Sequence, residues 1–327
     1  MGQPEFGERY GEQVASAYDR MAEEYDRFDA DTPFFINDYR VTRTTLEALR
    51  PRWEGKVVLD VGAGTGLQTA QFAPRARRVL ALDLAGDLLR KARQKVTAGG
   101  RRNVAFLQGN ATALPLEDAS ADFVCCYGDV IGLIPDYAAA IAEMARVCRS
   151  GGIVTVQYDN KWHVGLPWRP DELAGAVRTR GVGDKRIWTY TYISRPERVD
   201  FVYKTYTGQE MTRLLATAGL RVVRRLGLHM VSSIVPEPYQ TVYKDGQPLY
   251  NTFKRTILAL GRLDAALRGL DGKLETVDGW RLGFEDGWFL VRLSGTEPKV
   301  RITAEARTEA RAKELYELAL SKVMGAT

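Results

Sequence analysis

The sequence predicts an α/β protein with a mainly parallel sheet, followed by a small α+β domain. Between residues 56 and 158, short apolar segments alternate with helical ones, which is the pattern of parallel strands joined by helices. A glycine-rich turn at residues 62–66 follows the first apolar segment, where a strand becomes a helix. From residue 269 onward, short strands with Asp-Gly turns precede one closing helix.

The first 50 residues are predicted to form a helical cap. Apolar and aromatic side chains recur at helical spacing between residues 14 and 25. Pro33 then begins a second helix, and Arg50-Pro51 ends it. We therefore expect two helices before the first strand.

Five strands are expected next, in the segments KVVLDVG, RVLALDL, NVAFLQGN, DFVCCYG and IVTVQYD. Residues 160–207 lose this regularity and are rich in aromatic residues, which favours a lid or a substrate-binding insert. The helix GQEMTRLLATAG and the strand LRVVRRLGL follow, and an amphipathic helix ends near residue 268. We predict two domains, at residues 1–268 and 269–327.

Composition and charge narrow the class of protein. A net charge of +5 invites a nucleic-acid partner, but the basic pairs are scattered and form no single stripe. Three cysteines, two of them adjacent, argue against a disulfide framework, and the two histidines lack zinc-ligand spacing, so no metal site is expected. No apolar run reaches the roughly 18 residues of a membrane span, and the N-terminus lacks the apolar segment of a signal peptide. We expect a cytoplasmic protein with no membrane partner.

The turn VVLDVGAGTGLQTA carries Gly62, Gly64 and Gly66. Without Cβ atoms, the backbone can turn tightly there and admit a ligand. Asp60 precedes the turn, and Asp83 ends the next strand, where a carboxylate can accept both hydroxyls of a ribose.

This segment resembles the first motif of class I S-adenosylmethionine-dependent methyltransferases. The resemblance covers residues 10–230, through AYDRMAEEYDRF, ALDLAGDLLRKA, GNATALPLEDASADFV, CCYGDVIGLIPD and CRSGGIVTV. It implies a Rossmann-like methyltransferase fold with S-adenosyl-L-methionine as cofactor. Asn110 stands where the family usually has an acidic residue, and its amide oxygen can still bond the adenine amino group. The implied cofactor-binding residues are Tyr18, Tyr25, Asp60, Gly62, Ala63, Gly64, Gly66, Asp83, Leu84, Asn110, Ala111, Tyr127 and Gly128.

The chemistry of that family is an in-line displacement at a sulfonium methyl group, so the enzyme mainly aligns the nucleophile. An oxygen nucleophile of high pKa also gains from a general base. His163, Asp129 and Asp159 lie near the carboxyl ends of predicted strands and are the catalytic candidates. A hydrogen-bonded structural histidine is the alternative for His163.

A second turn, SGTEP, lies between Arg292 and Arg301. Its surroundings resemble the C-terminal domain of the α-D-phosphohexomutases, in which a loop of the form R-x-S-G-T-E-P-x-x-R grips a sugar phosphate. Backbone N–H groups and an arginine fork suit such an anion. We find no phosphoserine loop, metal-binding DxDxDR loop or sugar-specificity loop, so mutase activity is not expected. The implied phosphate-binding residues are Arg292, Ser294, Gly295, Thr296 and Arg301.

Together the two turns predict an O-methyltransferase acting on a phosphorylated small molecule, such as a sugar phosphate or nucleotide sugar. One alternative is a tRNA or rRNA methyltransferase, in which the arginines contact backbone phosphates. Another is a donor-binding protein whose C-terminal domain is an interaction or dimerisation module. A homodimer is therefore also considered.

Overall fold

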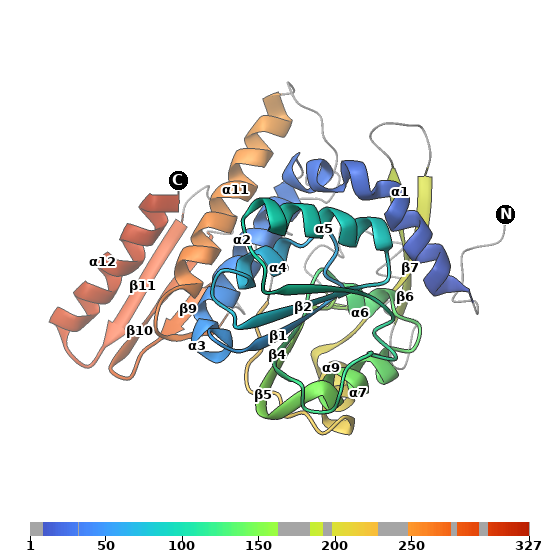
Figure 1. Ribbon diagram of the computed structural model, residues 1–327. Helices are drawn as coiled ribbons and strands as arrows, with labels where there is room; N and C mark the ends of the chain where they lie inside the picture. Colours follow the sequence, from blue (N-terminus) through green and yellow to red (C-terminus); the bar gives the residue numbers. More distant parts are fainter. Residues whose placement is uncertain are drawn as a thin grey trace. The chain divides into compact units, whose positions relative to one another are not determined.

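The computed structural model describes residues 9–31, 33–162, 184–191, 198–227, 248–275, 280–293 and 300–326 (Figure 1). These residues fall into two compact units. The first holds most of α1 and the chain from α3 to α9, and the second holds α2, α11 and everything after it.

The first unit is built on a five-stranded parallel sheet with the order β3-β2-β1-β4-β5. The predicted α/β fold with a parallel sheet is confirmed. Strand order reverses between β1 and β4, and ligands of open α/β sheets bind at the carboxyl ends of the strands beside such a reversal. Its elements are α1 (Tyr10–Asp31), α3 (Arg50–Trp53), β1 (Val57–Val61), α4 (Leu67–Phe72), β2 (Arg78–Asp83), α5 (Gly86–Ala98), β3 (Val104–Gln108), β4 (Ala121–Cys126), α6 (Val130–Leu133), α7 (Tyr137–Val147), β5 (Cys148–Val156), β6 (Asp184–Thr191), β7 (Arg198–Thr205) and α9 (Gly208–Thr217).

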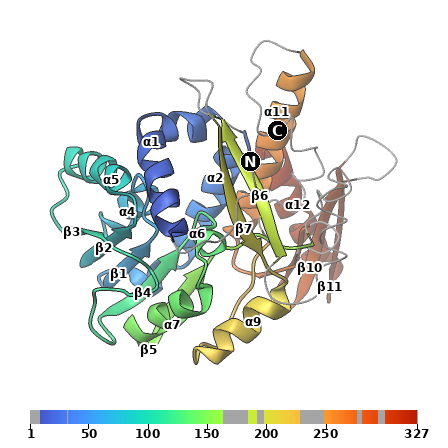
Figure 2. The same ribbon diagram turned by 90° about the vertical axis from the view of Figure 1, so that its right-hand side faces the viewer.

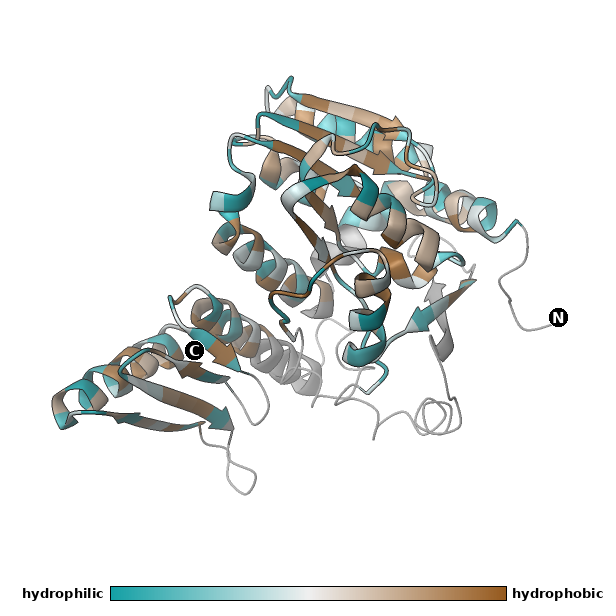
Figure 3. Ribbon diagram, turned by 90° about the horizontal axis from the view of Figure 1, so that it is seen from below, coloured by the Kyte–Doolittle hydropathy of each residue, from teal (hydrophilic) through white to brown (hydrophobic). Residues whose placement is uncertain are grey.

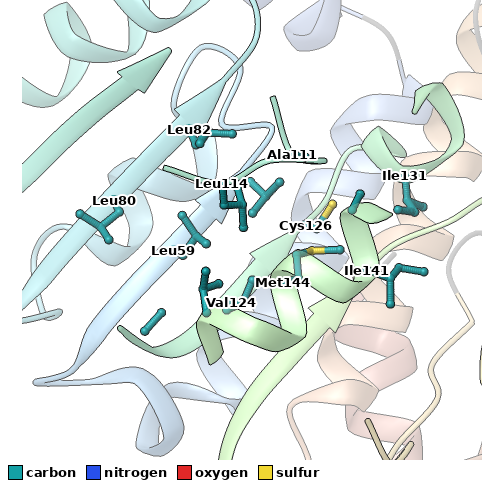
Figure 4. Close-up of a cluster of buried hydrophobic side chains, with 14 of the residues drawn as sticks. Leu59, Leu80, Leu82, Ala111, Leu114, Val124, Cys126, Ile131, Ile141 and Met144 are labelled. Carbon is teal, nitrogen blue, oxygen red and sulfur yellow. The ribbon is translucent and has the colours of Figure 1, made fainter. Parts of the chain in front are cut away.

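Helices cover both faces of this sheet, which explains why its strands are almost continuously apolar (Figure 3). On one face, Leu59 and Val124 pack with Ile141 of α7 in the main core (Figure 4). On the other, Phe123 of β4 meets Phe72 of α4, with ring centroids 5.9 Å apart.

The segment predicted to be irregular contains a regular antiparallel pair, β6 with β7 (Figure 2). Their register runs from Asp184 opposite Thr205 to Thr191 opposite Arg198. Phe201 of β7 is buried against α1, so this strand is anchored in the first unit. The prediction for β6 rested on its aromatic residues, although the alternation of hydrophobic and threonine residues in that segment favours a strand. A lid or substrate role for residues 160–207 stays a prediction.

The strand expected in LRVVRRLGL is wrong for its described part, because residues 220–227 form no strand. Val222 and Val223 are adjacent, so a strand would turn them to opposite faces. Val223 is 69% exposed, and no apolar face is buried there.

The second unit pairs four antiparallel strands, in the order β11-β10-β9-β8, with helices. This is the predicted α+β architecture. Trp280, Phe289 and Val291 are buried between the sheet and the helices, together with Leu267 and Leu315. Its elements are α2 (Pro33–Ala48), α11 (Pro248–Arg268), β8 (Lys273–Glu275), β9 (Trp280–Gly283), β10 (Gly287–Leu293), β11 (Val300–Ala306) and α12 (Glu309–Ala326).

Helix α2 packs against α11 within this second unit, and Arg40 Nη1 donates to the Leu258 carbonyl at 3.1 Å. A buried group also holds α11 to the sheet: Asp264 accepts from Trp280 Nε1 at 2.6 Å and from Arg268 Nε at 2.8 Å. Helices predicted as parts of the first domain therefore group with the closing strands. The functional boundary near residue 268 stays a prediction.

Candidate functional site

The three glycines of the first turn have different neighbours, although each has a positive φ, between 53° and 81°. A Cβ on Gly62 would lie 2.3 Å from Val130 Cγ2, and one on Gly66 would lie 2.8 Å from Ala92 Cβ. Gly64 has no atom within 4 Å of that position. Gly62 and Gly66 thus allow close packing of α6 and α5, whereas Gly64 faces open space.

The carboxylate of Asp83 ties the end of β2 to this turn. Its Oδ2 accepts from the Gly64 N–H at 2.8 Å, and its Oδ1 accepts from the Ala85 N–H at 2.9 Å. Burial raises the pKa of Asp83, and these N–H bonds oppose that rise. Each carboxylate oxygen has a second lone pair, so the group can also accept from hydroxyls of a ligand.

Asp60 lies beneath the turn and is 1% exposed. Thr69 Oγ1, on α4, donates to its Oδ2 at 2.6 Å. Burial raises the pKa of Asp60 to about 7. In this position it supports the turn from inside the protein, and a direct contact with the cofactor stays a prediction.

The next two strands also end at this edge. Asn110 is exposed, and its Oδ1 accepts from the Thr112 N–H at 3.0 Å, while Ala111 is buried in the main core. After β4, Gly128 has a φ of 78° and no atom within 4 Å of an added Cβ. The hydroxyl of Tyr127 pairs with Thr155 Oγ1 at 2.6 Å. The sheet therefore brings these predicted residues to the same edge as Gly64 and Asp83.

Helix α1 lies along the start of α5, beside the end of β2. The rings of Tyr18 and Tyr25 are 5.9 Å apart, and both pack with Ala85 and Leu88. An added Cβ on Gly11 would lie 3.6 Å from Leu84 Cδ2. The two predicted tyrosines thus lie close to the carboxyl end of β2, in apolar contacts. Their role as cofactor ligands stays a prediction.

The sequence reading missed a row of acids on α1 that holds this helix to the site. Asp26 accepts from Thr65 Oγ1 of the glycine turn at 2.5 Å and pairs with Lys95 of α5 at 3.0 Å. Asp19 accepts from the Asp87 N–H, in the first turn of α5, at 2.7 Å. Acids spaced by seven residues share one helix face, which is the signal that could have found them.

Two of the three catalytic candidates lie at the same carboxyl edge. Asp129 follows β4, begins α6 and has a φ of 56°, a conformation that Asp tolerates better than most residues. Asp159 follows β5, and its carbonyl accepts from the Tyr206 N–H at 2.9 Å. His163 lies outside the described residues. A catalytic role for any of them stays a prediction.

The predicted phosphate site is described only at its flanks. Arg292 of β10 stands directly opposite Arg301 of β11, where side chains share one face of the sheet. Like charges placed opposite each other destabilise a strand pair, and an anion between them would lower that cost. Ser294, Gly295 and Thr296 lie outside the described residues.

Within the ranges that the structure describes, no group of three or more His, Cys, Asp or Glu side chains could hold a metal ion. None of the described helices combines the length and the apolar character needed to cross a membrane. The cytoplasmic location stays a prediction.

Strand order and glycine turn together define an α/β protein whose glycine turn lies at the reversal between β1 and β4. Two family models then match the chain. The model described as a methyltransferase domain matches residues 58–152, and the one described as the C-terminal domain of phosphoglucomutase and phosphomannomutase matches residues 255–320. Both predicted resemblances are confirmed: one part of the chain matches a methyltransferase domain, and another matches a domain of the second kind.

Two similar curated proteins are methyltransferases, and each match covers less than half of this chain. The malonyl-[acyl-carrier protein] O-methyltransferase of Yersinia pestis is 36% identical over 141 residues, which cover 43% of this chain and 48% of that protein. The demethylmenaquinone methyltransferase of Listeria monocytogenes is 31% identical over 145 residues, which cover 43% of this chain and 60% of that protein. The chain thus spans about half the length of these relatives.

Solved structures give weaker likenesses. The 1,6-didemethyltoxoflavin-N1-methyltransferase of Burkholderia thailandensis has a TM-score of 0.49 and 19% identity, with 71% of this chain and 88% of that chain covered. An S-adenosylmethionine-dependent methyltransferase of Clostridium acetobutylicum has a TM-score of 0.47 and 15% identity, with 64% and 89% covered. We draw no conclusion on function from these two values.

Proposed function

We propose that the protein is an S-adenosylmethionine-dependent methyltransferase that acts on a phosphorylated small molecule. One observation carries the proposal that the protein binds the methyl donor. The Gly64 N–H donates a hydrogen bond to Asp83, and Gly64 itself faces open space. The match of residues 58–152 to a methyltransferase domain supports it.

The residues present fit the donor. The gap beside Gly64 would be filled by a Cβ in any other residue, as would the gap beside Gly128. Asp83 has acceptor capacity left for ribose hydroxyls, and Asn110 offers an amide to an adenine edge. When bound, the donor supplies an electrophilic methyl group on sulfur.

The chain's own contribution is to hold and align the reactants. Asp83 is oriented by two backbone N–H groups before any ligand binds, so it loses little freedom on binding. Asp129 and Asp159 stand at the edge where an acceptor hydroxyl would approach, and each is a candidate to take its proton. His163 remains the third candidate.

Calorimetry with cofactor-stripped protein tests the donor half. We expect S-adenosylmethionine or its demethylated product to bind at micromolar level or better. No measurable heat for either ligand would rule out the methyltransferase proposal. Methyl transfer is then assayed with labelled donor and a panel of acceptors: sugar phosphates, nucleotide sugars, RNA, malonyl-[acyl-carrier protein] and demethylmenaquinone. Donor binding with no transfer to any of them would favour the non-catalytic alternative.

The proposal that the methyl acceptor carries a phosphate rests on the arginine pair of the second unit. Arg292 and Arg301 flank the predicted SGTEP loop from adjacent strands, in a domain matched to the phosphoglucomutase and phosphomannomutase type. A guanidinium group gives a phosphate two parallel, charge-assisted hydrogen bonds. Our proposal is that this loop grips the acceptor phosphate.

The variant Arg292→Ala tests it. We expect a higher KM for a phosphorylated acceptor, equivalent to roughly 2–4 kcal/mol, with unchanged donor affinity. Arg307→Ala is the matched control, because Arg307 is exposed after the far end of β11. Equal effects of the two variants would refute a specific phosphate grip. Inorganic phosphate should compete with the acceptor but not with the donor.

One observation favours RNA as a second candidate acceptor. Arg221, Arg224 and Arg225 line a surface groove of about 630 Å³ after α9. Clustered arginines contact backbone phosphates and release counterions. A steep loss of acceptor binding with rising salt, shared by RNAs of unrelated sequence, would select this candidate over the small molecule.

A further inference from the structure

We propose that two copies of the chain associate through the outer edge of the C-terminal sheet, with β11 of one copy antiparallel to β11 of the other. The surface, called here the β11–α12 edge, consists of β11 and the α12 flank that carries Tyr316, Leu320 and Met324. This inference lies within the second unit and does not depend on methyl transfer.

The first observation is an open sheet edge. Among the strands that the structure describes, β11 pairs only with β10 and is seven residues long (Figure 1). Residues 300–306 contain no proline and show no bulge against β10, two devices that usually protect an edge strand. Val300, on its helix-covered face, is 39% exposed. Such an edge is a template for another strand.

The second observation is an apolar flank on α12. Tyr316, Leu320 and Met324 follow each other at intervals of four residues and therefore share one side of the helix. Their exposed fractions are 42%, 37% and 66%. Most exposed residues on a helix are polar, so this row indicates a surface that a partner covers.

The direction of that flank is fixed by the residues across the helix from it. Arg311 donates to Asp286 in the turn between β9 and β10, and Leu318 packs in the core of the unit. At 100° per residue, both lie nearly opposite Leu320. The apolar row therefore faces away from β9 and β10, beyond the β11 edge. One partner could cover the strand edge and the helix flank together.

Charge complementarity points to a second copy of this chain as that partner. Side chains of β11 alternate, with Arg301, Thr303 and Glu305 exposed on the outer face. In an antiparallel pair centred on Thr303, Arg301 of each copy faces Glu305 of the other, twice by symmetry. Ile302 likewise faces Ala304, both on the helix-covered face. The two α12 helices would then run side by side with their apolar rows in contact.

Sedimentation equilibrium of the full chain tests the proposal. We expect a concentration-dependent dimer. Leu320→Glu should raise the dimer dissociation constant at least about tenfold, because it places an unpaired charge in the contact. The control Val223→Glu changes a 69% exposed valine of the other unit and should leave the constant unchanged. Thermal unfolding of each variant checks that it is folded.

A charge reversal tests the register. Glu305→Arg and Arg301→Glu should each weaken the dimer about tenfold, since each replaces two attractions by two repulsions. The double variant Arg301→Glu/Glu305→Arg restores both pairs and should recover the original constant. A chain that stays monomeric at all concentrations overturns the proposal. So does a dimer unaffected by Leu320→Glu and by both single reversals. Failure of the double variant to recover would overturn the Thr303-centred pairing.

Discussion

The chain has one glycine-containing segment after β1, at residues 62–66, and another between β10 and β11, and the residues that flank these segments differ in kind. In the first, at residues 62–66, the structure accounts for each glycine, and Asp83 binds the turn through the Gly64 N–H. In the second, the strands on either side bring Arg292 opposite Arg301. The Asp83 carboxylate and the backbone hold the first turn, whereas the strands that flank the second segment place two like charges opposite each other.

The difference indicates how a ligand would affect each segment. A turn that is already held in shape binds without a large ordering cost, which suits a cofactor used in every reaction cycle. An anion bound between two facing arginines would lower the repulsion between them. We therefore expect the first turn to be sensitive to packing and to buried charge, and the second to added anions.

The largest expected effect concerns Asp60 and pH. Because burial raises its pKa to about 7, the native state binds more protons than the unfolded state between about pH 4 and pH 7. Stability should fall as pH rises from about 4 to 7 and then level off, by on the order of 4 kcal/mol relative to Asp60→Asn. Urea unfolding of both proteins across this range measures it, and parallel profiles would contradict it.

Packing at the first turn gives the next effect. Gly62→Ala combines a left-handed backbone with a clash against Val130 and should cost about 3 kcal/mol of unfolding free energy. Gly64→Ala and the control Gly55→Ala have positive φ but no nearby atom, so each should cost about 1–2 kcal/mol.

The affinity for the methyl donor should distinguish Gly64→Ala from Gly55→Ala. Only Gly64→Ala should weaken S-adenosylmethionine binding in calorimetry, because Gly55 precedes β1 at the opposite end of the strand. If both variants bound the donor normally, the gap beside Gly64 would not be a ligand site.

Anions should affect the second turn. At one hundred times its dissociation constant, phosphate should stabilise the C-terminal unit by about 2.7 kcal/mol. Hydrogen exchange of β10 and β11 with and without phosphate measures this locally. Arg292→Ala should abolish the protection and Arg307→Ala should keep it. Protection that survives Arg292→Ala would show that the anion binds elsewhere.

The loss of the Asp83 carboxylate should have a smaller effect than the pH change, Gly62→Ala or added phosphate. Asp83→Ala should weaken donor binding by about 2 kcal/mol, the cost of unmade bonds to a charged group. Asp87→Ala, an exposed acid in the first turn of α5, is the control and should bind normally. Donor affinity that Asp83→Ala leaves unchanged would remove the ribose contact from the proposal.

Some of the site could be predicted because its signals are local. The glycines after β1 and the acid after β2 are set by what a tight turn and a strand end require. The acidic row on α1 was missed, because Asp26 meets Thr65 only after the helix folds back onto the sheet. The β6–β7 pair was not predicted, because the aromatic residues of this segment were taken to indicate an insert and the alternation of hydrophobic and threonine residues was not considered. Position in the sequence alone could not show that Asp60 is buried whereas Asp83 is partly exposed.

By itself, the sequence determined the parallel sheet, the glycine turn after β1 and the two kinds of domain, because hydrophobic periodicity and turn residues act over short distances. Tertiary structure decided which side chains meet. It grouped α2 and α11 with the closing strands and set Arg292 opposite Arg301. It also left Tyr316 and Leu320 exposed on α12, next to β11, which pairs only with β10 among the described strands. These are contacts between residues far apart in the chain or differences in burial, which depend on how elements pack and not on the local sequence.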